Sequence, residues 1–117
     1  MGKDKDSIRW LDDPEDHDFP AALSYLGLLL DDAQAAAVVE RLRAAPQTRF
    51  KAKDILRASR LNLLGASNDH IEKNLAKVED GKPLSPLLLV RDTALRAVIV
   101  ADGYHRLCAI YRLDEDA

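Results

Sequence analysis

The chain has 117 residues, of which 47% are hydrophobic and 32% are charged, and its formal net charge is −3 at pH 7. This length and apolar content suit a single domain whose core needs neither disulfides nor a structural metal. One cysteine excludes an internal disulfide framework, and no cluster of His and Cys has zinc spacing, so we predict a reducing, cytoplasmic setting. No apolar run approaches the length of a membrane span, so no membrane association is expected.

Residues 1–18 form an acidic N-terminal segment, which we expect to carry a net negative charge. Trp10 and Leu11 interrupt its charged residues, and large apolar side chains of this kind favour burial. We therefore predict that the segment folds back onto the body of the protein. Contact with a partner is the alternative.

Residues 19–46 are predicted to form a helical hairpin extension. Proline is tolerated in the first turn of its first helix, and leucines at helical spacing then predict one buried face. These leucines are Leu23, Leu26 and Leu30. A second, alanine-rich helix over residues 33–44 follows an aspartate cap and stops at Pro46. The pair is expected to cover one face of a sheet.

Residues 47–117 contain the remaining predicted elements. A helix beginning at Asp69 and reaching about residue 78 has apolar residues on one side, and residues 87–90 and 98–100 read as two adjacent strands joined as a hairpin. A last helix follows Gly103. The fold class is therefore expected to be α+β, a small mixed β-sheet packed with helices and preceded by the helical hairpin.

The most informative feature is the change of hydrophobic period at Gly103. An apolar strand, residues 97–100, leads into an Asp-Gly turn, after which Leu107, Ile110 and Tyr111 recur at helical spacing. The first backbone N–H groups of a helix have no internal acceptor, and the helix dipole puts partial positive charge beside them. Such a strand, turn and helix junction is typical of an anion-binding corner.

Five consecutive residues are the candidate ligand-binding residues of this corner. Gly103 permits close approach of a ligand, and Tyr104 and His105 present backbone and ring donors. The guanidinium of Arg106 matches two phosphate or carboxylate oxygens. Asp102 either helps to hold Mg²⁺ through water or caps the helix. The alternative is that these residues form an ordinary turn and a solvated helix start.

His70 and Glu72 are additional candidates, because they lie early in the helix that begins at Asp69 and face either the corner or water. Cys108 is flanked by Leu107 and Ala109, a pattern typical of a small buried residue rather than an activated thiolate. No catalytic residue and no metal ligand is assigned from the sequence.

The motif over residues 102–109 resembles the signature of the ParB and sulfiredoxin superfamily, which has a Gly-x-x-Arg core that opens a helix. Residues 50–56 resemble the first strand of that family, residues 68–80 its following helix, and residues 84–90 a strand with a central proline. The resemblance implies a ParB-like domain over residues 47–117 whose corner holds nucleotide phosphates. It also implies ATP or another nucleotide with Mg²⁺ as a cofactor.

The branches of this superfamily differ in activity. Sulfiredoxins carry a cysteine nucleophile immediately before the His-Arg pair, where this chain has Tyr104, so that chemistry is not expected. A partition protein needs a helix-turn-helix domain and a dimerisation tail after this module, and few residues follow Arg112. A branch that phosphorylates free serine has the most similar motif, and such a reaction requires a base and a metal-bound nucleotide.

The predicted function is binding of a nucleotide or another phosphate-bearing ligand, with phosphotransfer as an extension. The alternative is a noncatalytic DNA-associated or regulatory interaction module. Seven basic and two acidic residues lie between Glu40 and Arg60, but the negative chain as a whole disfavours DNA binding. No carboxylate cluster suggests a two-metal nuclease. The family's final strand has no counterpart, so a second copy or the N-terminal segment is expected to fill an open sheet edge.

Overall fold

The computed structural model describes residues 8–62, 69–114 and 116. These residues form an α+β structure, as predicted, with five helices and two antiparallel strands. The helices and strands, in chain order, are α1 (Asp18–Leu26), α2 (Asp32–Ala44), α3 (Ala52–Ser59), α4 (Asp69–Glu79), β1 (Leu88–Asp92), β2 (Ala97–Asp102) and α5 (Tyr104–Leu113). The expected mixed sheet is wrong for the described residues, because their one parallel pairing is an isolated bridge between Trp10 and Leu84.

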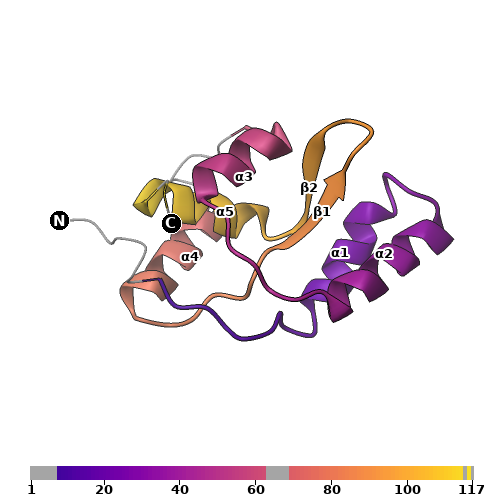
Figure 1. Cartoon of the computed structure of the whole chain (residues 1–117). Helices are drawn as coiled ribbons and strands as arrows, with labels where there is room; N and C mark the ends of the chain where they lie inside the picture. The colour runs from indigo at the N-terminus through magenta and orange to yellow at the C-terminus, as the bar shows by residue number, and fades with distance from the viewer. Residues whose placement is uncertain (1–7, 63–68, 115, 117) are drawn as a thin grey trace.

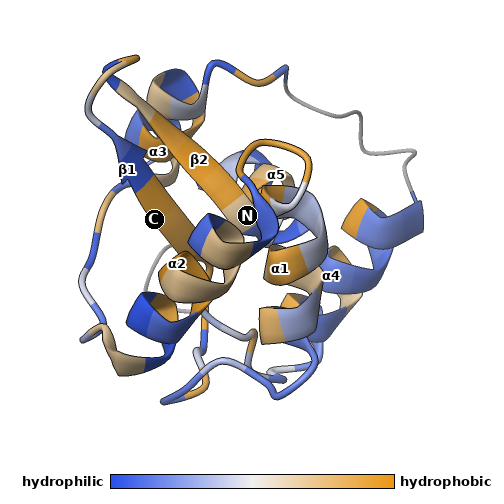
Figure 2. Ribbon diagram, turned by 90° about the vertical axis from the view of Figure 1, so that its right-hand side faces the viewer, coloured by the Kyte–Doolittle hydropathy of each residue, from blue (hydrophilic) through white to orange (hydrophobic). Residues whose placement is uncertain are grey.

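The helices lie in two groups on either side of the β1–β2 hairpin, with α1 and α2 in one group and α3, α4 and α5 in the other (Figure 1). Strand β2 contacts both groups, through α1 and through α3. Apolar residues run along most of β2 (Figure 2). A strand that packs on both faces needs apolar side chains on both, which explains why this strand does not alternate between apolar and polar residues.

The two faces of the strands belong to different clusters of buried residues. One cluster joins α1 and α2 to Leu88 and Ala101, which confirms that the helical hairpin covers one face of the sheet. The other joins Val100 to apolar residues of α3, α4 and α5. Because helices α1 and α2 share this core with the strands, their burial stabilises the end of β2 that leads into Gly103.

The buried face of α1 differs from the predicted one. Phe19, Ala22 and Leu26 are buried, whereas Leu23 is 41% exposed. The helix ends at Leu26, so its core-facing stripe follows the spacing of Phe19, Ala22 and Leu26 and leaves Leu23 to one side. Of the predicted leucines, Leu26 is buried as expected, and Leu30 lies beyond the end of the helix and packs against the same core, so the sequence predicted too long a helix and was wrong only for Leu23.

Helix α2 begins at a capping box, which confirms the predicted aspartate cap. The Asp31 carboxylate accepts a 2.7 Å hydrogen bond from the Gln34 backbone N–H, and the Gln34 side chain accepts one from the Asp31 N–H. We expect Asp31→Ala to lower the free energy of unfolding by about 1 kcal/mol, since one helix-end donor loses its acceptor. Chemical denaturation would measure this. Asp32→Ala is the control, and an equal loss in both variants would contradict the capping assignment.

The predicted strand over residues 50–56 is wrong, because helix α3 occupies most of this segment. Ala52, Ile55 and Leu56 contact the core from one helical face, and Phe50 precedes the helix and is exposed. Alternation holds only at the start of the segment, whereas the spacing of residues 52, 55 and 56 follows the helical period. The part of the family resemblance that rests on a first strand therefore has no support here.

The predicted α4 helix and the predicted β-hairpin are both confirmed. Ile71 and Val78 of α4 are buried, as their spacing indicated. Strands β1 and β2 pair in antiparallel register from Leu89 opposite Val100 to Asp92 opposite Ala97. The predicted cap before α4, at residues 67 and 68, lies outside the described residues.

The N-terminal segment folds back onto the body of the protein, as predicted. The Leu11 N–H donates to the Leu84 carbonyl and the Leu84 N–H donates to the Arg9 carbonyl, each at 2.8 Å. Ile8 enters the core, but Trp10 stays 38% exposed, so the prediction that Trp10 is buried is wrong. Within the described ranges, none of the helices combines the length and apolar character that a membrane span requires.

Candidate functional site

The predicted corner lies at the junction of β2 and α5. Strand β2 ends at Asp102, Gly103 follows with φ of 103°, and α5 begins at Tyr104. The hydrogen bonds of the helix start with the Leu107 N–H, which donates to the Gly103 carbonyl at 2.9 Å. The N–H groups of the first three helical residues precede that bond and point toward the start of the helix, where an anion would be stabilised.

Gly103 is required at this junction for two physical reasons. Its φ lies in the region that side chains with a Cβ rarely adopt. A Cβ at this position would also stand 2.5 Å from Leu87 Cδ2 and 2.8 Å from an Arg106 terminal nitrogen. The close approach that Gly103 permits is therefore to the protein's own Leu87 and Arg106.

The guanidinium of Arg106 is anchored within the protein. One terminal nitrogen donates to the Asp102 carboxylate at 3.1 Å and to the Pro86 carbonyl at 3.2 Å. Its side chain is only 16% exposed, and its Nε is buried without a hydrogen-bond partner in the described part of the chain. A buried donor of this kind costs about 1–3 kcal/mol, so Arg106 is held in place while part of its hydrogen-bonding capacity stays unused.

Asp102 does not cap α5, so that alternative from the sequence is wrong. Gly103 is the N-cap residue, no side chain caps it, and the Asp102 carboxylate pairs with Arg106 instead. Burial raises the pKa of Asp102, Arg106 opposes this through its hydrogen bond and charge, and the neighbouring Asp18 carboxyl raises the pKa further. Asp102 thus lies between one cation and one like charge.

Two imidazole rings meet beside the start of α5. The ring centroids of His70 and His105 are 4.7 Å apart, and the Tyr104 ring lies 6.0 Å from that of His105. Burial and the nearby His70 lower the pKa of His105, which favours the uncharged ring at neutral pH. An uncharged imidazole at the corner has one nitrogen that donates and one that accepts.

Of the two additional candidates on α4, His70 is the one whose ring meets the corner, and Glu72 is an exposed residue of the same helix. Cys108 is fully buried, which confirms the prediction of a small core residue. Burial and Cys108 raise the pKa of Tyr104, so its phenol stays protonated at neutral pH.

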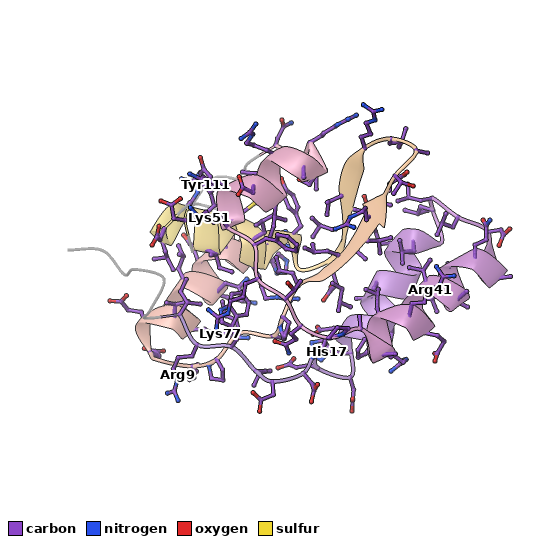
Figure 3. All side chains as sticks on the ribbon, viewed as in Figure 1. Arg9, His17, Arg41, Lys51, Lys77 and Tyr111 are labelled. Atoms are coloured by element: carbon purple, nitrogen blue, oxygen red, sulfur yellow. The ribbon has the colours of Figure 1, made fainter. Side chains whose placement is uncertain are left out.

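The sequence did not predict that Asp18 belongs to this site. Asp18 is 2% exposed, its carboxylate accepts a 2.9 Å hydrogen bond from the Glu15 N–H, and its neighbour across the fold is Asp102. His17 Nε2 lies 3.0 Å from a Glu15 oxygen and 3.4 Å from an Asp18 oxygen. Figure 3 labels His17 where the N-terminal segment reaches α1. An acidic residue in the first turn of a helix is ordinary, so no local pattern distinguished Asp18.

No family model, curated protein or solved structure matches this chain. The corner combines helix N–H groups that have no acceptor within the helix, a cation and two imidazoles. These groups suit an anionic ligand, and they provide donors from both backbone and side chains. Asp102 opposes an anion, but its charge is offset by Arg106 at 3.1 Å.

The basic residues between positions 40 and 60 are spread over several elements. Arg43 pairs with Glu40 at 3.3 Å and lies over the Phe19 ring, and Lys53 reaches Asp116 at 3.0 Å. Several of these cations thus have acidic or aromatic partners in their own chain. This distribution differs from the continuous basic stripe that is typical of nucleic-acid interfaces.

Proposed function

We propose that this protein binds a phosphate-bearing ligand, and in particular a nucleotide, at the corner formed by Asp102, Gly103, Tyr104, His105 and Arg106. The observation that carries the proposal is the unused hydrogen-bonding capacity there. The buried Nε of Arg106 lacks a partner among the described residues, and it belongs to the same turn as the first N–H groups of α5, which have no acceptor within the helix and no side-chain cap. Phosphate oxygens are the acceptors that satisfy such donors together.

Phosphotransfer is the reaction that this binding mode supports best. It requires a group that accepts a proton from the attacking hydroxyl, and His105, with its lowered pKa, is the nearest uncharged base to the start of α5. Carboxylate oxygens suit Mg²⁺, and Asp102 is the carboxylate of the corner. The resemblance to the ParB and sulfiredoxin superfamily supports a nucleotide as the ligand, and the single buried cysteine supports a cytoplasmic location.

Thermal unfolding tests the proposal directly. The chain is heated with ATP, ADP, CTP, GTP or phosphoserine, each with and without Mg²⁺. A ligand at about 100 times its dissociation constant stabilises the folded state by about 2.7 kcal/mol, which corresponds to a rise in midpoint of roughly 10 °C for a domain of this size. We expect at least one nucleotide to give such a rise.

Two substitutions connect the rise to the corner. His105→Gln removes the base but keeps polarity, and Arg106→Lys keeps the charge but loses the planar fork, so each should reduce the ligand-induced rise. Arg112→Ala, at the other end of α5, is the control and should not change it. If no ligand raises the midpoint, the noncatalytic interaction module becomes the better description of the protein.

A further inference from the structure

A hollow of about 190 Å³ runs along one side of β2, and we call it the β2 groove. Four successive strand residues, 97–100, line it, together with Tyr25 of α1 and Leu61, which follows α3 in the chain. Successive strand residues point to opposite faces, so a hollow that touches all four follows the edge of the strand. Within the described sheet, β2 pairs with β1 alone, and this edge carries no second strand.

The walls of the β2 groove are largely apolar and accessible, and the polar residues of its lining are Ser59, Arg60 and Asp92, one cation and one carboxylate among them. Tyr25, Leu61 and Leu95 are 40%, 38% and 64% exposed, which is unusual for large apolar side chains gathered at one place. The volume is below the roughly 300–1,000 Å³ of ordinary small-molecule pockets. Side chains of an extended peptide suit this space better than a compact ligand does.

One end of the groove is positively charged. Arg57, Arg60 and Arg96 surround an adjoining hollow that contains one carboxylate, Asp54. Neither Arg57 nor Arg96 has an ion-pair partner among the residues that the structure describes. Because the whole chain carries a net charge of −3, this concentration of arginines is a local feature that favours an acidic partner.

The backbone at this end is also strained. Arg60 and Arg96 have φ of 59° and 52°, and they are the two non-glycine residues with positive φ in the described ranges. The Arg60 guanidinium donates to the Leu95 and Arg96 carbonyls, which fastens the β1–β2 turn to the end of α3. Strained backbone of this kind persists where the surrounding structure holds it, commonly at binding clamps.

We propose that the β2 groove binds an extended segment of a partner protein, added as a strand to β2, with apolar residues along the groove and acidic residues beside Arg57 and Arg96. The free edge supplies backbone hydrogen bonds, the groove accepts alternate side chains, and the arginines select the charge of the segment. This surface shares no residue with the corner at Gly103, so the inference does not depend on the proposed ligand there.

The test uses a fluorescein-labelled peptide, Glu-Glu-Thr-Val-Thr-Val-Thr-Glu-Glu, in fluorescence anisotropy with the full chain. We expect saturable binding, and we expect replacement of its glutamates by lysines to weaken it at least tenfold, the effect of two or three surface ion pairs. Methylation of alternate peptide nitrogens should abolish binding, and amide hydrogen exchange in residues 97–100 should slow when the unmodified peptide binds. Binding that survives methylation would overturn strand addition.

Matched variants locate the site. The double variant Arg57→Ala, Arg96→Ala should lose the preference for glutamate ends, whereas Arg41→Ala, Arg49→Ala, with the same charge change elsewhere, should keep it. Leu61→Ser should weaken binding, whereas Leu28→Ser, at a more exposed residue outside the groove, should not. A dimer in light scattering that Leu61→Ser dissociates, with no peptide binding, would overturn the proposal in favour of a second copy of this chain.

Discussion

Replacing Gly103 by alanine should destabilise the protein by about 3 kcal/mol. Left-handed backbone costs a residue with a Cβ about 1–2 kcal/mol, and forcing a side chain into a packed site costs a similar amount. Both costs apply here, because φ is 103° and the added Cβ would stand 2.5 Å from Leu87 Cδ2. The loss corresponds to a fall in thermal midpoint of roughly 12 °C, which calorimetry would measure.

Gly81 provides the matched control. It also has positive φ, 73°, but among the described residues no atom other than those of its chain neighbours lies within 4 Å of an added Cβ. Gly81→Ala therefore carries the backbone cost alone, about 1 kcal/mol. Equal losses in the two variants would show that Leu87 and Arg106 yield freely, and that crowding at the corner contributes nothing to stability.

Replacing Arg106 by methionine should lower the free energy of unfolding by about 2–3 kcal/mol at neutral pH. Methionine keeps an apolar stem of similar length, so the loss comes from leaving the carboxylate of Asp102, 18% exposed, beside Asp18 without its cation. This value lies below that of a fully buried pair, since both partners reach solvent. Arg106→Ala is consequently expected to weaken the fold as well as any ligand binding at the corner.

The loss should depend on pH in a direction set by Asp102. Its folded-state pKa is raised above the ordinary value of 3.8, so the folded protein holds this proton more tightly than the unfolded chain does. The resulting stabilisation is fully present below the unfolded pKa and is lost as pH rises through the folded pKa. Arg106 lowers the pKa of Asp102, so in Arg106→Met the folded-state pKa is higher still, and the stabilisation by the bound proton persists to higher pH. Mild acid should therefore restore part of the stability of Arg106→Met relative to the unsubstituted protein.

The double variant Arg106→Met, Asp102→Asn isolates this titration. It has no carboxylate at position 102, so its stability relative to the unsubstituted protein should lack the recovery in mild acid. Guanidinium denaturation at several pH values would measure both variants. A deficit in Arg106→Met that stays constant from neutral to mildly acidic pH would contradict the role assigned to Asp102.

The sequence predicted best where a local pattern determines the structure. The change of period at Gly103 located the junction of β2 and α5, and Asp31 marked the start of α2. In both cases, the residues that fix the backbone are adjacent in sequence. The residues of the corner were found for the same reason, because a strand, a glycine and a polar helix start are contiguous.

Prediction failed where distant contacts decide the outcome. Apolar and charged residues alternate over the first positions of the segment at Ala52, which is typical of a strand. Its helical conformation depends on the contact of one helical face with the core that includes α5. Asp18 approaches Asp102 across most of the chain, and no spacing rule relates them. The hydrogen bond from Arg106 to the Pro86 carbonyl could not be predicted either, because every residue has a backbone carbonyl and the sequence does not show which one accepts.

Asp102 lies beside both Arg106 and Asp18, so it couples ligand binding at the corner to the docking of α1. A ligand that draws the guanidinium away changes the energy of two facing carboxyls, and one of them begins α1. The coupling is the same in both directions. If a ligand at the corner changes the free energy of docking of α1, then docking of α1 changes the free energy of ligand binding by the same amount. Undocking of α1 is thus expected to change the affinity for a ligand at the proposed corner by the same factor by which that ligand changes the undocking equilibrium.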